Sequence, residues 1–169
     1  MFFLIELNIL IFDCVFVLKT MFDTSHIHPM LVHFPIALTL LGVLFEGLYL
    51  FKPAKFRYPC GELILYFATI SALSAATAGS LFTPDFTNPE LAQAKNIHST
   101  FAGITVTLLC ITSAIYLTMT FIGCYIPRFA CYNSQMHKTG FVFYILSALM
   151  VSVTGFYGGI LVYNDLLRI

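Results

Sequence analysis

Histidine is the residue type in this sequence that most plainly carries chemistry, because imidazole binds metal ions and transfers protons near neutral pH. Five histidines occur among 169 residues. His26, His28 and His33 lie close together, His98 stands well apart from them, and His137 lies further along the chain. Whether these side chains can act together depends on the elements that position them.

The composition decides what kind of elements these are. Hydrophobic residues make up 59% of the chain and charged residues only 9%, whereas an average soluble domain has about 25% charged residues. A soluble fold of this size would lack the polar residues to cover its surface. The formal net charge is zero and Lys and Arg form no long run, which excludes a nucleic-acid binder and a disordered chain. We therefore expect an integral membrane protein in contact with the lipid bilayer.

Four apolar stretches are long enough to cross a bilayer core as helices, which takes about 20 residues each. Strands are excluded because the stretches show no alternation of apolar and polar residues. Proline and asparagine predict turns at Lys52–Lys55, Thr83–Pro89 and Ile126–Ser134. The expected fold is all-α, an antiparallel four-helix transmembrane bundle with spans at Met30–Phe51, Glu62–Phe82, Phe101–Ile122 and Phe141–Tyr163.

The N-terminal 20 residues permit two interpretations. Met1–Leu18 is apolar but short, and it lacks the basic start of a signal peptide. It is either an extra N-terminal helix or upstream sequence ahead of a start at Met21. We favour the second, because Met21 leads directly into the first span. Residues 21–169 are expected to form a single four-helix transmembrane domain.

The first and third spans bring histidines to the same side of the membrane. Asn88 suits a helix N-cap, Pro89 the first helical position and Glu90 the positive end of the helix dipole. The third helix is therefore predicted to begin before its apolar part, with His98 on it. His33 lies about one turn inside the first span, so it and His98 are expected at similar depth.

Two imidazoles on facing helices can hold a haem iron from opposite sides, and ionisable residues at membrane depth are functional hypotheses by default. We predict one b-type haem between the first and third helices, ligated by His33 and His98. Ala37 and Ala102, each about one turn deeper, would leave room for the macrocycle. The motif Cys-x-x-Cys-His is absent from the sequence, which excludes covalent c-type attachment.

Two alternatives to the haem remain open. His26 or His28 could join His33 and His98 in binding copper or zinc. Alternatively, no cofactor is bound and the imidazoles lie half hydrated among the lipid headgroups, hydrogen-bonded to Asp85, Glu90 or lipid phosphate.

The basic residues predict the orientation, because Lys and Arg are in excess on the cytoplasmic side. We call side A the side on which the first span begins, and side B the opposite one. Side A holds three basic residues and side B holds five: Lys52, Lys55, Arg57, Arg128 and Lys138. The histidine-rich side A is therefore predicted to face the periplasm from a bacterial inner (cytoplasmic) membrane.

On side B, Glu46 lies near the end of the first span. It is expected to reach the interface or to pair with Lys138 or Arg128, with a proton relay as the alternative. His137 has no histidine opposite it, so a second bis-histidine haem is not expected. On side A, Pro35 frees the carbonyl of Leu31 and predicts a local kink.

Small residues recur every four positions in the second span, which predicts close helix packing. They form two rows: Ala68, Ala72 and Ala76, and Ser71, Ala75 and Gly79. The five cysteines show no zinc-ligand spacing, so free thiols are expected. The sequence offers neither a phosphate-binding loop nor a set of catalytic residues for a hydrolase or a transferase, so neither of these two enzyme classes is expected.

Three strings resemble one bacterial family of membrane proteins. The first span opens with His28-Pro29-Met30-Leu31-Val32-His33-Phe34-Pro35-Ile36-Ala37-Leu38, a lone His98 heads the third helix, and the last span closes with Thr154-Gly155-Phe156-Tyr157-Gly158-Gly159-Ile160-Leu161-Val162-Tyr163. Together they are similar to the family catalogued as domain of unknown function 2231. The resemblance covers residues 26–163, while the last six residues depart from the continuation common in that family.

This resemblance implies that the protein works with redox partners, because members of the family also occur fused to Rieske-type or cytochrome-like domains. The first functional hypothesis is accordingly an electron-transfer or redox-associated subunit with a periplasmic, membrane or quinone partner. The second is a non-catalytic membrane scaffold or partner subunit, for which a homo-oligomer is one form. Binding of copper or zinc is the third.

Overall fold

The computed structural model of the protein describes residues 27–52, 60–82, 87–125 and 130–166, with side chains in these ranges except at 122–125, 130–133 and 164–166. The predictions for residues 1–20, for a start at Met21 and for His26 lie outside the described residues. So does most of the predicted turn after Lys52.

The described chain is helical almost throughout. Its elements are α2 (Ile27–Leu31), α3 (His33–Phe51), α4 (Cys60–Phe82), α5 (Pro89–Tyr125) and α6 (Ala130–Leu166). Four helical stretches are long and apolar enough to cross a membrane, with α2 and α3 together forming the first. The predicted all-α membrane bundle with four spans is thus confirmed.

The last of the predicted turns overlaps a helix. Ala130–Ser134 belongs to α6, while residues 126–129 lie outside the described residues. The sequence explains this extension, because residues 130–139 include neither proline nor glycine to interrupt a helix.

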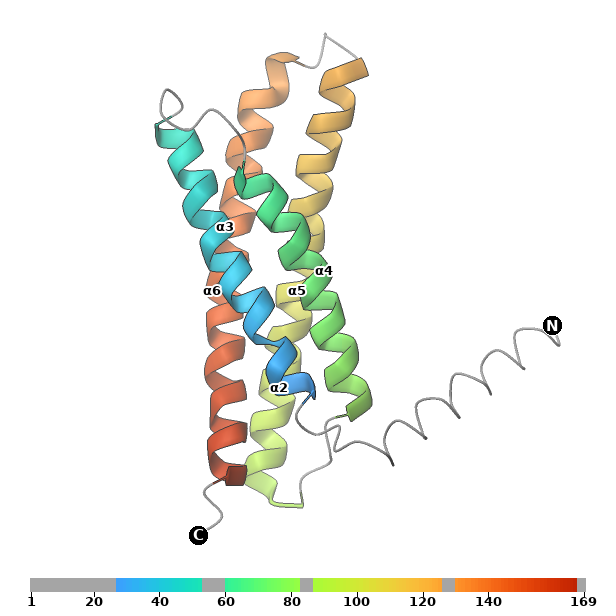
Figure 1. The fold of residues 1–169 in the computed structure, drawn as a ribbon, viewed down its shortest axis with the longest axis vertical. Helices are drawn as coiled ribbons and strands as arrows, with labels where there is room; N and C mark the ends of the chain where they lie inside the picture. Colours follow the sequence, from blue (N-terminus) through green and yellow to red (C-terminus); the bar gives the residue numbers. More distant parts are fainter. Residues whose placement is uncertain (1–26, 53–59, 83–86, 126–129, 167–169) are drawn as a thin grey trace, which may run out of the picture.

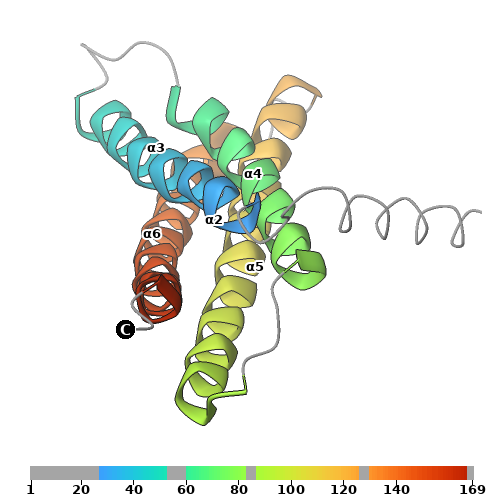
Figure 2. The ribbon, with the colours of Figure 1, turned by 60° about the horizontal axis from the view of Figure 1, so that its bottom comes forward.

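The helices pack as an antiparallel bundle in which chain neighbours are also neighbours in space. α3 contacts α4 and α6, α4 contacts α5, and α5 contacts α6, so the ring of four closes. Figure 2 shows the helices arranged around a common centre. In Figure 1, α2, the start of α5 and the end of α6 all lie at the lower end of the bundle. The elements that carry His28 and His98 therefore meet at one end.

The start of α5 follows from local capping chemistry, as predicted. Asn88 precedes the helix, and its side-chain Oδ1 accepts a hydrogen bond from the backbone N–H of Glu90 at 2.9 Å. The Asn88 carbonyl accepts the first helical bond, from Ala92 N–H at 3.0 Å. An asparagine N-cap of this kind contributes about 1 kcal/mol. It begins the helix nine residues ahead of His98, which is therefore on a helix.

A break separates α2 from α3 at Val32. Pro35 lies three residues further on, where its missing N–H leaves the carbonyl of Leu31 without its usual helical donor. The break at Val32 thus lies next to the Leu31 carbonyl, where the kink was predicted, and it separates His28 from His33. The backbone of Val32 keeps right-handed helical angles, so the chain continues in the same general direction.

The bundle interior combines many small and polar residues with a few large ones, among them Leu65, Leu109 and Tyr116, while most other large apolar residues face outward. On α4 the exposed side chains include Leu63, Phe67, Ile70 and Leu73. The buried ones are Gly61, Leu65, Ala68, Thr69, Ala72, Ala75 and Ala78. This distribution, with small residues inside and large apolar residues outside, suits a helix that packs closely on its neighbours and meets lipid on its other face.

The predicted row of Ala68, Ala72 and Ala76 is correct for its first two members only, because Ala76 is exposed. The physical reason is the helical period: residues four apart drift by about 40° per step, so a strict four-residue row leaves the interface after two steps. The buried row continues through Ala75 instead.

We expect Ala72→Leu to lower the free energy of unfolding by about 1–3 kcal/mol, because the added atoms enter the contact between α4 and its neighbours. Ala76→Leu, one turn away on the exposed face, is the matched control and should leave it unchanged. Unfolding in mixed detergent micelles with increasing dodecyl sulfate, followed by circular dichroism, measures both. Equal effects of the two substitutions would contradict the packing described.

Candidate functional site

His28 is anchored to a neighbouring helix. It lies in the first turn of α2, and its Nδ1–H donates a hydrogen bond to the carbonyl oxygen of Ala75 on α4 at 2.9 Å. A carbonyl only accepts hydrogen bonds, so this contact fixes which ring nitrogen carries the proton. The ring is half-buried.

His98 is held in the same way by the other pair of helices. It lies on α5, and its Nδ1–H donates to the carbonyl oxygen of Thr154 on α6 at 2.9 Å. The hydroxyl of Thr154 lies 3.3 Å from that of Thr105, which is about two turns further along α5 than His98. A second contact between α5 and α6 thus stands beside the imidazole.

The two imidazoles face each other. Their ring centroids are 6.0 Å apart and the ring planes are nearly perpendicular, at 84°. Two imidazoles on one metal ion, at metal–nitrogen distances of about 2.0–2.1 Å, have centroids roughly 5 Å apart at a tetrahedral angle and roughly 6.4 Å apart on opposite sides of the metal. With both Nδ1 atoms bound to carbonyls, each neutral ring keeps its lone pair on Nε2. This is the arrangement in which a histidine ligand is oriented by a carbonyl behind it.

Glycines make room for both rings. A Cβ atom built on Gly79 of α4 would lie 2.9 Å from Cε1 of His28, and one on Gly158 of α6 would lie 3.0 Å from Cε1 of His98. Both distances are too short for an undisturbed contact, so a larger residue at either position would push the ring away. Gly159, by contrast, has nothing within 4 Å of such an atom.

His33 occupies a different place from the one its predicted role requires. Its ring is exposed, and its Nδ1–H donates to the Pro29 carbonyl of its own helical run at 2.7 Å. His28 and His33 are five residues apart, which turns them by roughly 140° about a helix axis. They therefore cannot both face His98, and the ring that lies against His98 is that of His28. Ala37 is exposed and Ala102 half-buried.

Within the described ranges, no group of three or more His, Cys, Asp or Glu side chains could hold a metal ion. Cys60 and Cys110 are free and exposed. The other cysteines and His26 lie outside the described side chains. The described part of the site therefore offers two protein ligands, His28 and His98.

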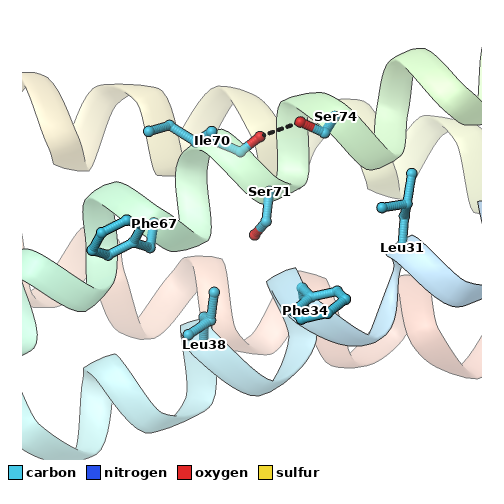
Figure 3. A pocket seen from close by; sticks show the side chains of 7 residues that line it. All are labelled: Leu31, Phe34, Leu38, Phe67, Ile70, Ser71 and Ser74. Atoms are coloured by element: carbon cyan, nitrogen blue, oxygen red, sulfur yellow. Dashed lines mark hydrogen bonds between the residues drawn. The ribbon is translucent and has the colours of Figure 1, made fainter.

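A groove of about 330 Å³ lies between α2–α3 and α4, close to His28 in the sequence. Figure 3 shows Leu31, Phe34 and Leu38 on one wall and Phe67, Ile70, Ser71 and Ser74 on the other. Its two hydroxyls donate to carbonyls of α4 itself, and Phe34 and Phe67 are largely exposed. The groove is thus a lipid-facing surface without metal-ligating side chains.

The side chain of Glu46 lies inside the bundle and not on its surface. Its side chain is fully buried and accepts a hydrogen bond from Tyr116 Oη on α5 at 3.0 Å. His137 Nδ1 lies 3.5 Å from the same carboxylate oxygen. Lys138 is exposed, and Arg128 lies outside the described residues. His137 therefore has a carboxylate as its neighbour within the membrane.

The comparison with protein families gives one match. The family described as predicted membrane protein (DUF2231) matches residues 24–169, which is most of the chain. The chain belongs to this family. Searches of curated proteins and of solved structures found no match. The resemblance drawn from the sequence is confirmed, and both His28 and His98 of this DUF2231 protein lie within the matched residues.

Sequence reasoning found His98 and named His28 only as an alternative ligand, and it did not find Tyr116 or Tyr144. The sequence signal available for His28 and His98 was the pair of glycines Gly79 and Gly158, because each lies where an imidazole ring from another helix needs space. The tyrosines carried no comparable signal.

We expect both His28 and His98 of this DUF2231 protein to be the Nδ1–H tautomer at mildly alkaline pH, where a neutral imidazole prevails. Nitrogen-15 NMR of the histidine-labelled full chain in lipid nanodiscs distinguishes the two tautomers, and His28→Gln and His98→Gln assign the signals. An Nε2–H tautomer at either position would be incompatible with the carbonyl contacts described.

Proposed function

We propose that this membrane protein binds one b-type haem through His28 and His98 and serves in electron transfer. His28 takes the place that the sequence suggested for His33. The observation that carries the proposal is the facing pair of imidazoles, each with Nδ1 bound to a backbone carbonyl and Nε2 left for a ligand.

The number of protein ligands favours haem over a bare metal ion. Zinc and copper sites usually draw three or four ligands from the protein, whereas haem iron brings four nitrogens of its own and needs two axial ligands. The two imidazoles of the described site match the second requirement. The small residues beside them, Gly79 and Gly158, keep bulky side chains away from both rings.

A haem held by His28 and His98 would supply one-electron chemistry, and with both imidazoles used as ligands electron transfer would be favoured over reaction with a substrate. The protein's own contribution is to hold and tune the two imidazoles. The carbonyls of Ala75 and Thr154 fix the ring orientation and make each imidazole a better electron donor. Because these carbonyls belong to helical backbone, the rings have rigid supports.

The proposal also assigns the side of the membrane on which the haem would lie. The excess of basic residues at the opposite end supports a histidine end that faces the periplasm from a bacterial inner membrane. A haem there would exchange electrons with a periplasmic or membrane redox protein. The redox domains fused to relatives support this choice of partner.

We expect the full chain purified from haem-replete cells to show a Soret band that shifts on reduction with dithionite. His28→Ala and His98→Ala should each abolish the band, because each removes one axial ligand. His33→Ala and His137→Ala should retain it, as matched histidine controls away from the pair. Absorption spectra and pyridine haemochrome assays measure the haem content.

Circular dichroism and size exclusion show whether the alanine variants still fold, and added imidazole should restore part of the Soret band in a folded variant. A colourless wild-type protein defeats the proposal. Stoichiometric copper or zinc would support a bare metal site instead, and loss of the band with His33→Ala but not with His28→Ala would restore the pair of His33 and His98. A colourless protein that repeatedly co-purifies with one membrane protein would support the scaffold alternative.

We expect Gly158→Val to lower the haem content several-fold and Gly159→Val to leave it unchanged. At Gly158 the first added carbon lies 3.0 Å from the His98 ring, and at Gly159 it meets open space. Haem per protein, measured at equal expression, distinguishes the two neighbours. Equal haem content in the two variants would show that the His98 ring does not depend on the space at Gly158.

A further inference from the structure

A second polar site lies at the other end of the bundle, around the carboxyl group of Glu46. The side chain of Glu46 has no exposed surface, and Glu46 belongs to the membrane-spanning stretch Ile27–Phe51. A buried charge costs several kcal/mol unless it is paired. An ionisable residue in such a position calls for a functional explanation.

All four helices contribute to this site. α3 provides Glu46, α5 provides Tyr116, and α6 provides His137 and Tyr144. From α4, Gly61 packs directly on the carboxyl group: a Cβ atom there would lie 2.7 Å from Glu46 Oε2. A glycine at this position leaves the space that the carboxyl group occupies. The site thus depends on the assembled bundle.

Several buried polar atoms of the site have hydrogen-bonding capacity left over. Glu46 Oε2, His137 Nδ1 and the Tyr144 hydroxyl have no hydrogen-bond partner among the described residues. Tyr144 Oη lies against α3 at Gly42, about one turn from Glu46. Since buried polar groups are normally satisfied, the unused capacity gathered here suits the binding of a small hydrogen-bonding species.

The charged groups around Glu46 restrict what that species is. A second carboxyl group, Glu62 on α4, accepts hydrogen bonds from Tyr66 at 2.6 Å and Thr120 at 2.7 Å. It acts electrostatically on Tyr116, and Glu46 acts on Tyr66. The nearby cations Lys52 and Lys138 are exposed. Without a proton on either Glu46 or His137, the pair would carry a buried negative charge, and one proton shared between them removes it.

His137 connects the buried carboxyl group with the outside. Its Nδ1 lies 3.5 Å from Glu46 Oε1, while 20% of its side-chain surface is exposed. The ring is held between Tyr49 and Tyr116, at centroid distances of 6.1 Å and 5.5 Å. A ring with one nitrogen facing a buried acid and part of its surface exposed is suited to carry protons between them.

We propose that Glu46 and His137 form a proton-binding site that is loaded from the adjacent membrane surface through His137. Protonated His137 gives its Nδ1 proton to Glu46 Oε1, which leaves a neutral imidazole and a carboxylic acid. The reverse transfer returns the proton. The hydroxyl of Tyr116 donates to the carboxylate and positions it. This site is independent of the histidine pair at the opposite end and of any haem there.

Infrared difference spectroscopy on the full chain in lipid nanodiscs tests the proposal. Spectra at low minus high pH should contain a C=O stretch from a protonated carboxyl group. Glu46→Gln should remove this band, whereas Glu62→Gln, which changes the other carboxyl group, should retain it. Tyr116→Phe should shift its frequency because the hydrogen bond to the carboxyl group is lost.

Transfer into D₂O tests the role of His137, because deuterium moves the same band. His137→Phe should slow this exchange by about tenfold or more, since the proton carrier is removed. His137→Gln should be slow as well and replaces the Phe variant if that variant does not fold. Glu62→Gln, which leaves both Glu46 and His137 in place, should exchange at the wild-type rate.

Three results would overturn the proposal. One is a wild-type spectrum from which Glu46→Gln removes nothing. Another is exchange at the wild-type rate in His137→Gln. The third is a band that responds to added sodium at constant pH, which would make this a cation site.

Discussion

The lipid interior supplies no hydrogen-bond partners, so polar groups inside the bundle depend on the protein for theirs. Most hydroxyl groups of the core meet this demand locally, by donating to the carbonyl four residues earlier in their own helix; Thr105, Thr112, Ser147 and Thr154 are examples. Such bonds do not select a neighbour. His28, His98 and Glu46 instead take their partners from other helices, and these contacts specify which helix faces lie together.

Local sequence chemistry was sufficient to predict most of the fold. The spans follow from apolar length, and the start of α5 follows from Asn88 and Pro89, whose effects act within one turn. Close packing of α4 was also predictable from its alanines. Ala76 marks the limit of that prediction, because a four-residue spacing does not equal the helical period and only a three-dimensional partner shows which row is buried.

The candidate sites were only partly predictable, because they depend on the rotation of helices about their axes. His28 and His33 are equally close to the start of the first span in sequence, yet only one of them can face α5. The break at Val32 lies between them and adds to this uncertainty. For Glu46, the decisive partner Tyr116 is 70 residues away in the sequence. No local sequence pattern encodes this long separation, or the rotation of α5 that turns Tyr116 toward Glu46.

Each of the two imidazole–carbonyl hydrogen bonds forms within one half of the chain. His28 is bound within the hairpin of α2, α3 and α4, and His98 within the hairpin of α5 and α6. Each hairpin can complete its own bond alone, whereas the two rings meet only when the hairpins associate. A ligand held by both rings would bind the associated halves and neither half alone, and so would stabilise their association by mass action.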